Sequence, residues 1–159
     1  MANIELLIKT TPNSYSYYEE HSTFHTGDAG LDLFVVEDYT IKAGEVAFIS
    51  FQIQCQMVET NEIGVSKDVS YYLYARSSLS KTPLMLANGV GVLDSCYRGP
   101  IIAALKNTSL QDYKINAGQR LVQICTRNLD SFNIRVVDEL SLTSRGNGGF
   151  GSTDKISSK

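Results

Sequence analysis

A carboxylate, an aromatic ring and a guanidinium fall within one short stretch in the middle of the chain. The segment from Asn88 to Gly99 contains Asp94, Tyr97 and Arg98 close together, beside a break in the strand pattern. A carboxylate has a reference pKa near ~3.9, so it is ionised at neutral pH and can activate a bound water as a general base. We therefore take Asp94 as a candidate general base; an Asp that caps a turn is the alternative.

Glycines, an arginine, an aromatic ring and two hydroxyls gather near the C-terminal end. Residues 145–153 read Arg-Gly-Asn-Gly-Gly-Phe-Gly-Ser-Thr. Glycine-rich backbone can turn its N–H groups toward an anion, and the planar guanidinium of Arg145 matches phosphate oxygens. Ser152 and Thr153 add donors, and Phe150 adds a flat face that can cover a base. The segment predicts a lid over a nucleotide; a disordered tail is the alternative.

Two earlier segments carry groups that suit phosphate or a metal. Residues 75–78 read Ala-Arg-Ser-Ser at the end of a strand pattern, which suits a phosphate cradle; a serine N-cap is the alternative. Asp32 stands between two leucines, where a buried carboxylate must be paired or hydrogen-bonded, and it can also contact a metal-bound water. Further along, simple alternation places Arg120 and Gln123 on opposite faces of a strand.

The elements that must position these groups are strands. Apolar residues and glutamines alternate from Phe51 to Met57, which predicts one face in a core and one toward solvent or a polar layer. Further short strands are predicted at 31–36, 69–74, 101–105, 121–126 and 134–137. Asn88-Gly89 predicts a hairpin turn, Ser77 to Lys81 one short turn of helix, and Glu59 to Asp68 a surface loop.

This pattern predicts an all-β fold, a sandwich or barrel, in one main unit. Apolar periodicity stops at about Ser141, so we expect a β-barrel domain over residues 1–140 and a flexible C-terminal arm over residues 141–159.

Composition narrows the class of protein. The 159 residues suit a single domain, and a net charge of -3 argues against a nucleic-acid polymer as partner. Three scattered cysteines and no secretory leader indicate reduced thiols in a cytoplasmic or nuclear protein. No apolar run reaches the ~18 residues that a membrane span needs. His21 and His25 lack an evident third ligand, so we expect no metal site there.

Taken in order, five segments resemble the five motifs of the trimeric dUTP pyrophosphatases (dUTPases). The matching segments are residues 29–33, 75–78, 91–99, 118–123 and 145–153. The resemblance implies a distorted jelly-roll-like β-barrel that assembles as a homotrimer, with active sites shared between chains and the arm of one chain closing over the others. It also implies hydrolysis of dUTP to dUMP and pyrophosphate, which keeps dUTP low and supplies dUMP for dTMP synthesis.

The resemblance assigns roles residue by residue. Asp94 would activate the water that attacks the α-phosphorus, and Tyr97 would stack under the deoxyribose and exclude a 2′-hydroxyl. Mg²⁺ would bridge the phosphates, with Asp32 touching one of its waters. The remaining substrate-binding residues implied are Arg76, Ser77, Ser78 and Gln123 for the phosphates, Asn88, Gly91, Val92 and Leu93 for uracil, and Arg145, Phe150, Gly151, Ser152 and Thr153 from the arm.

Four positions depart from the family's pattern. Ala75 stands where Pro is usual, Ser78 where Gly is usual, Gln119 where an acidic residue is usual, and Asp154 where a Gly is usual. Two alternatives to a dUTPase are a catalytically silent dUTPase-like module that binds nucleotides or regulates, and a relative of the dCTP deaminases. The deaminases carry a catalytic Glu where this chain has Ala104.

Overall fold

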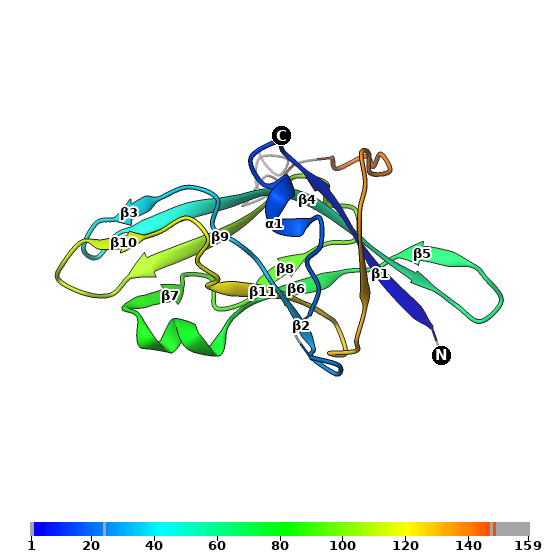
Figure 1. Ribbon diagram of the computed structural model, residues 1–159, viewed down its shortest axis with the longest axis horizontal. Helices are drawn as coiled ribbons and strands as arrows, with labels where there is room; N and C mark the ends of the chain where they lie inside the picture. Colours follow the sequence, from blue (N-terminus) through cyan, green and yellow to red (C-terminus); the bar gives the residue numbers. More distant parts are fainter. Residues whose placement is uncertain (1, 24, 147, 149–159) are drawn as a thin grey trace, which may run out of the picture.

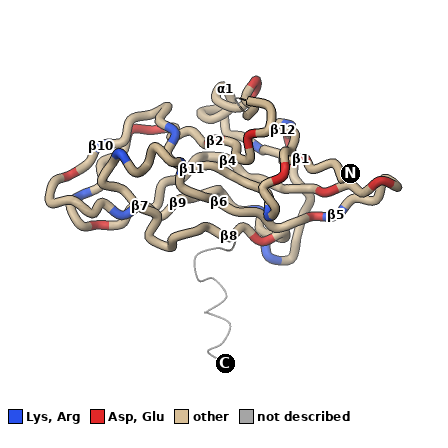
Figure 2. The backbone as a smooth tube through the Cα atoms, turned by 90° about the horizontal axis from the view of Figure 1, so that it is seen from below, with Lys and Arg blue, Asp and Glu red and all other residues tan. Residues whose placement is uncertain are grey.

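The computed structural model describes residues 2–23, 25–146 and 148, and its regular secondary structure is almost all strand (Figure 1). The strands form a large sheet, a four-stranded sheet and a two-stranded pair. The predicted all-β fold is confirmed. Lys and Arg positions are interspersed with Asp and Glu positions over the backbone (Figure 2).

The large sheet forms one side of the core. Its strands, in spatial order, are β12 (Asn133–Val136), β1 (Asn3–Thr10), β4 (Val46–Thr60), β9 (Pro100–Asn107) and β7 (Leu84–Leu86), and β5 (Ser66–Asp68) pairs with the end of β4. Only the pairing of β1 with β12 is parallel among these described strands. Along β4, Phe51, Ile53 and Cys55 are buried, as the alternation predicted.

The four-stranded sheet carries most of the candidate site. Its antiparallel strands, in spatial order, are β2 (Gly30–Asp32), β11 (Val122–Thr126), β6 (Tyr71–Ala75) and β8 (Gly91–Leu93). Leu31, Ile124 and Leu73 are paired across the strands and buried, so this face packs on the core. Because side chains alternate along a strand, the neighbouring Asp32, Gln123 and Tyr74 lie on the opposite face.

The two-stranded pair and two short helices complete the fold. The pair consists of β3 (Tyr39–Ile41) and β10 (Tyr113–Ile115), at the opposite end of the molecule from β5 (Figure 1). The helices are α1 (Tyr15–Tyr18) and the 3-10 helix η1 (Ser77–Lys81). The helical turn predicted at Ser77 to Lys81 is therefore confirmed, because η1 begins directly after Arg76 in extended backbone.

Two local predictions are wrong. The turn at Asn88-Gly89 is present, with Gly89 at a φ of 73°, but it joins strands of different sheets instead of a hairpin. β7 pairs with β9, whereas β8 pairs with β6. Each strand pairs where its apolar side chains can be buried in the core, and the turn between them does not decide this. The segment from Glu59 to Asp68 is a hairpin of β4 and β5, not a loop.

Candidate functional site

A pocket of about 210 Å³ surrounds the candidate base, Asp94. We call it the Asp94 pocket. Its lining residues are Leu73, Asn88, Gly91, Val92, Leu93, Asp94, Tyr97, Pro100, Ile102 and Arg145. The structure thus brings together seven residues predicted from sequence for the base, the uracil-binding main chain, the sugar platform and the arm.

Strand β8 and the turn after it position Asp94 and Tyr97. β8 ends at Leu93, and the Tyr97 amide donates to the Asp94 carbonyl at 3.0 Å, which closes the turn. The Tyr97 hydroxyl donates to the Pro100 carbonyl at 2.7 Å, so the ring is fixed at both ends, and burial raises the pKa of Tyr97. The Asp94 side chain keeps 51% of its surface exposed, which leaves room for a water and a substrate.

Arg145 caps this pocket from the start of the arm. Its guanidinium donates to the Asp94 carboxylate and lies 5.5 Å from the centre of the Tyr97 ring. Its Nε donates to the Gly148 carbonyl at 2.8 Å. The bond to Asp94 raises the pKa of Arg145, so the guanidinium stays charged. The Arg145 guanidinium therefore covers part of the Asp94 carboxylate.

A second and larger pocket, of about 920 Å³, lies on the opposite face of the four-stranded sheet. We call it the Arg76 pocket. Among its lining residues are Gly30, Asp32, Tyr74, Arg76, Ser77, Arg120, Gln123 and Cys125. Two guanidiniums, a hydroxyl and an amide make this pocket suited to phosphate oxygens.

Asp32 organises the two arginines of the Arg76 pocket. Its carboxylate accepts from Arg76 Nε at 2.7 Å and from an Arg120 guanidinium nitrogen at 3.2 Å. The Asp32 side chain is only 9% exposed, and two ion pairs compensate its buried charge. Arg76 also donates to Ser78 Oγ at 3.0 Å. His21 Nε2 lies 2.8 Å from the Asp32 carbonyl oxygen, and burial lowers the pKa of His21.

The prediction that Arg120 and Gln123 point to opposite faces is wrong. Both line the Arg76 pocket. Alternation fails because β11 begins only at Val122, and Leu121 and Val122 are both buried in succession. Arg120 was missed as a site residue from sequence, and only its pairing with Asp32 identifies it.

The structure divides the predicted site residues into two groups. Asp94 and the uracil-binding segment belong to one pocket, and Asp32, Arg76, Ser77 and Gln123 belong to the other. Ser78 lies behind the Arg76 pocket as an acceptor for Arg76. The predicted arm residues Phe150, Gly151, Ser152 and Thr153, and the departure at Asp154, lie outside the described residues.

Within the part of the chain that the structure describes, no group of three His, Cys, Asp or Glu side chains is placed to hold a metal ion. Among the same residues, no helix is long and apolar enough to cross a membrane. The three cysteines are free, and burial raises the pKa of the Cys125 thiol beside Gly30.

The fold is that of a known class of nucleotide hydrolase. The dUTPase of Staphylococcus bacteriophage 80alpha, solved with dUpNHpp, is 22% identical with a TM-score of 0.61, and the match covers 92% of this chain and 96% of that one. A crystal structure of dUTPase from Streptococcus mutans is 26% identical with a TM-score of 0.57, covering 82% and 94%.

Sequence comparisons give the same family. The dUTPase family model matches residues 21–154. The deoxyuridine 5′-triphosphate nucleotidohydrolase of Clostridium acetobutylicum is 38% identical over 130 residues, which cover 81% of this chain and 84% of the relative. The chain belongs to the dUTPase family, so the family that its sequence resembles is confirmed.

Proposed function

We propose that the chain hydrolyses dUTP to dUMP and pyrophosphate by a water that Asp94 activates for attack on the α-phosphorus. Its family membership makes it a dUTP diphosphatase, an enzyme of nucleotide metabolism. The observation that carries the mechanism is the half-exposed Asp94 carboxylate in a pocket with Tyr97 and Arg145. As a general base, Asp94 contributes roughly 10²–10⁴-fold to the rate. The reaction keeps dUTP low and supplies dUMP for dTMP synthesis.

The Asp94 pocket receives the nucleoside. Main-chain groups of the turn and strand from Asn88 to Leu93 hydrogen-bond uracil, and they include Gly91 and Val92. A Cβ on Gly91 would lie 3.0 Å from Leu73 Cβ, so the main chain packs closely against β6 here. The Tyr97 ring, held by its bond to Pro100, lies under the deoxyribose and leaves no room for a 2′-hydroxyl.

The Arg76 pocket receives the phosphates. Ser77 and Gln123 line it with Arg76, and Ser78 supports the Arg76 guanidinium. Arg120 adds a second positive charge, which the resemblance did not assign. Arm residues complete the grip: Arg145, Ser152 and Thr153 hold the γ-phosphate, while Phe150 and Gly151 close over the uracil.

Mg²⁺ would bind together with the substrate. The described residues offer no dedicated metal cage, which fits an ion held mainly by phosphate oxygens and waters. When bound, Mg²⁺ would supply positive charge against the charge that develops on the leaving pyrophosphate. Asp32 would reach it only through a water, because its carboxylate oxygens accept from Arg76 and Arg120.

A homotrimer with shared sites accounts for the separation of the pockets. The Asp94 pocket and the Arg76 pocket lie on opposite faces of one sheet, so a single chain offers the nucleoside half and the phosphate half of different sites. Assembly about a threefold axis brings the Asp94 pocket of one chain to the Arg76 pocket of its neighbour. We place the protein in the cytoplasm or nucleus, and we assign it no nucleic-acid or membrane partner.

Two residues argue against the alternatives. The position where a deaminase carries its catalytic Glu is Ala104, a 5% exposed methyl group in β9 that cannot shuttle a proton. A catalytically silent module has no need for a base, yet this chain keeps Asp94 exposed to its pocket.

Pyrophosphate release tests the mechanism across dUTP, the other deoxynucleoside triphosphates and UTP. Wild-type protein should turn over dUTP selectively. Asp94→Asn should still bind dUpNHpp but release pyrophosphate at least about a hundredfold more slowly. Asp130→Asn, an exposed surface change, serves as the matched control. Near-normal turnover by Asp94→Asn would remove Asp94 from its role.

A further inference from the structure

We propose that Ser70 is a positioning residue for Asp94, the base proposed above. Its hydroxyl holds the main chain directly after Asp94, so that the carboxylate keeps its place in the Asp94 pocket. Ser70 belongs to none of the five segments that resemble the dUTPase motifs, and the resemblance gives it no role. The inference deepens the proposed function and rests on the role of Asp94 in it.

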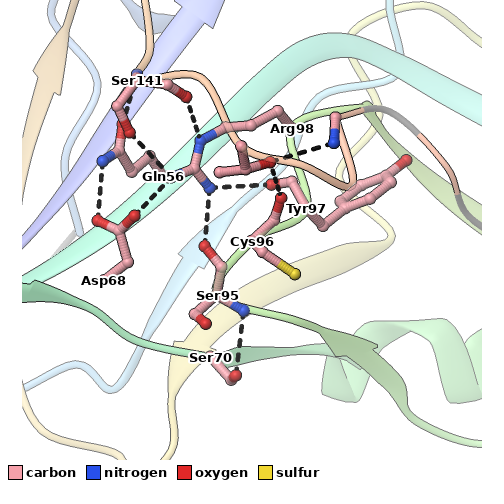
Figure 3. A network of polar contacts seen from close by, with 10 residues as sticks. Gln56, Asp68, Ser70, Ser95, Cys96, Tyr97, Arg98 and Ser141 are labelled. Carbon is pink, nitrogen blue, oxygen red and sulfur yellow. Dashed lines mark hydrogen bonds and ion pairs between the residues drawn. The ribbon is translucent and has the colours of Figure 1, made fainter.

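Ser70 lies beside the turn that carries Asp94, directly before β6 (Figure 3). The Ser95 amide donates to Ser70 Oγ at 3.1 Å. The peptide unit that joins Asp94 to Ser95 also offers the Asp94 carbonyl, which accepts from the Tyr97 amide at 3.0 Å. Both polar groups of the peptide unit next to the Asp94 Cα are therefore held, one by main chain and one by the Ser70 side chain.

The Ser70 hydroxyl supplies a hydrogen bond where the strand pairing ends. β6 and β8 are antiparallel, and their last pair at this end joins Tyr71 with Leu93. One step further, the same register places Ser70 opposite Asp94. The side-chain bond to Ser95 thus extends the support of β6 by one residue, to the residue that carries the proposed base.

Arg98 holds the same turn from a second side (Figure 3). One of its guanidinium nitrogens donates to the carbonyls of Ser95 at 2.8 Å and Tyr97 at 3.2 Å. Asp68 pairs with this buried guanidinium at 2.6 Å and compensates its charge. Because these contacts do not involve Ser70, the turn should stay folded without the Ser70 hydroxyl, and only the peptide unit before Ser95 should gain freedom.

The main chain decides where the Asp94 carboxylate lies, because little of the side chain is packed. The Asp94 side chain keeps 51% of its surface exposed. A general base must lie within hydrogen-bond reach of its water, and a misplacement of ~1 Å can cost about 10²-fold in rate. Loss of one neutral hydrogen bond corresponds to a smaller factor, roughly fivefold.

The effect should fall on kcat and not on binding. Ser70 is exposed and lies outside the lining residues of both pockets. Water can therefore replace its hydroxyl as the acceptor for the Ser95 amide, so removing the hydroxyl leaves no buried donor unpaired. The main chain from Asn88 to Leu93 and the Arg76 pocket keep their own contacts, so the nucleotide should bind as before.

The bond is tested by Ser70→Ala, with Ser70→Thr as the rescue and Ser66→Ala as the matched control. Thr keeps the hydroxyl oxygen that accepts from Ser95. Ser66 lies on the neighbouring β5, and its hydroxyl bonds to Thr60 Oγ1 at 2.8 Å, away from the turn. In Ser70→Ala, kcat for dUTP should fall about fivefold. In the other two variants kcat should stay within about twofold of the wild-type value.

Binding of dUpNHpp separates positioning from a loss of folded protein. Turnover is expressed per dUpNHpp-binding site, counted by calorimetric titration, so that unfolded molecules do not lower it. The Kd of dUpNHpp should stay within about twofold in all three variants. Turnover of Ser70→Ala equal to that of Ser66→Ala would overturn the proposal. So would a Ser70→Thr protein as slow as Ser70→Ala, or a loss that appears in the Kd instead of kcat.

A double variant shows whether Ser70 acts through Asp94. Positioning a base that is absent has no effect, so Asp94→Asn with Ser70→Ala should be as slow as Asp94→Asn alone. A further fivefold loss, roughly that of the single variant, would assign Ser70 to another route and overturn the inference. Failure of the proposed function is a separate result, because Asp94→Asn alone would then release pyrophosphate at a near-normal rate, whatever the effect of Ser70→Ala.

Discussion

Leu73 and Tyr74 are neighbours in β6, yet each lines a different pocket. Leu73 contributes to the Asp94 pocket and Tyr74 to the Arg76 pocket. The alternation of a strand turns successive side chains to opposite faces, so the two pockets are separated by the thickness of the sheet. The proposed base on one face and the proposed phosphate ligands on the other therefore do not meet within one chain.

Mixing two inactive variants should therefore restore activity. Asp94→Asn removes the proposed base, and Ser77→Asp places a negative charge where phosphate should bind. In oligomers of equal amounts of the two chains, about a quarter of the sites combine the intact halves if neighbours share sites. Pyrophosphate release from dUTP should approach that fraction of the wild-type rate. If confirmed mixed oligomers are as inactive as each parent, the halves do not combine across chains.

Tyr97 should set the preference for deoxyribose. Tyr97→Ala removes the ring, so the ratio of kcat/KM for dUTP over UTP should fall by at least about tenfold. Tyr97→Phe keeps the ring and loses only the bond to the Pro100 carbonyl, at a cost of about 1 kcal/mol in the free energy of unfolding. Its selectivity should stay near the wild-type value. A Tyr97→Ala protein that rejects UTP as well as wild type would assign the discrimination to another group.

Removing Mg²⁺ should stop turnover without loosening the fold. We proposed that substrate phosphates and waters hold the ion, so it should bind with the substrate and not as a structural element. A chelator should abolish pyrophosphate release, and added Mg²⁺ should restore it, with the thermal midpoint of unfolding unchanged throughout. A solved dUTPase of phage phi11 is described as coordinating a structural Mg(II) ion. A fall of several degrees in the midpoint on chelation would indicate such an ion here.

Local sequence patterns predicted these elements well, because the alternation of apolar and polar residues reflects which face of its own strand each side chain occupies. The alternation from Phe51 to Met57 lies inside β4, with its apolar residues buried, and the short helix at Ser77 is present. The motif spacing also led to the family. The turn at Asn88-Gly89 shows the limit, since turn chemistry is local whereas strand pairing is decided by distant partners.

Contacts between distant residues could not be predicted from the sequence. Asp32 meets Arg120 because β2 and β11 pair in a register that places Asp32 opposite Gln123. Asp68 meets Arg98 only because β5 folds back along β4. Both pairs depend on strand register, and a sequence of alternating residues does not fix which strand lies beside which.

The position of the Gln123 side chain should require a glycine at residue 30. The two residues lie on neighbouring strands, and a Cβ on Gly30 would come within 2.0 Å of Gln123 Oε1 and 3.2 Å of Cys125 Sγ. Gly30→Ala must therefore push the Gln123 amide out of the Arg76 pocket, and kcat/KM for dUTP should fall about fivefold, the loss of one hydrogen bond to substrate. In a Gln123→Ala background the same change meets no amide, so it should cost little further activity. Steady-state kinetics of the two single variants and the double variant measure this coupling. Fully additive losses would show that Gly30 acts on the site by some other route than Gln123.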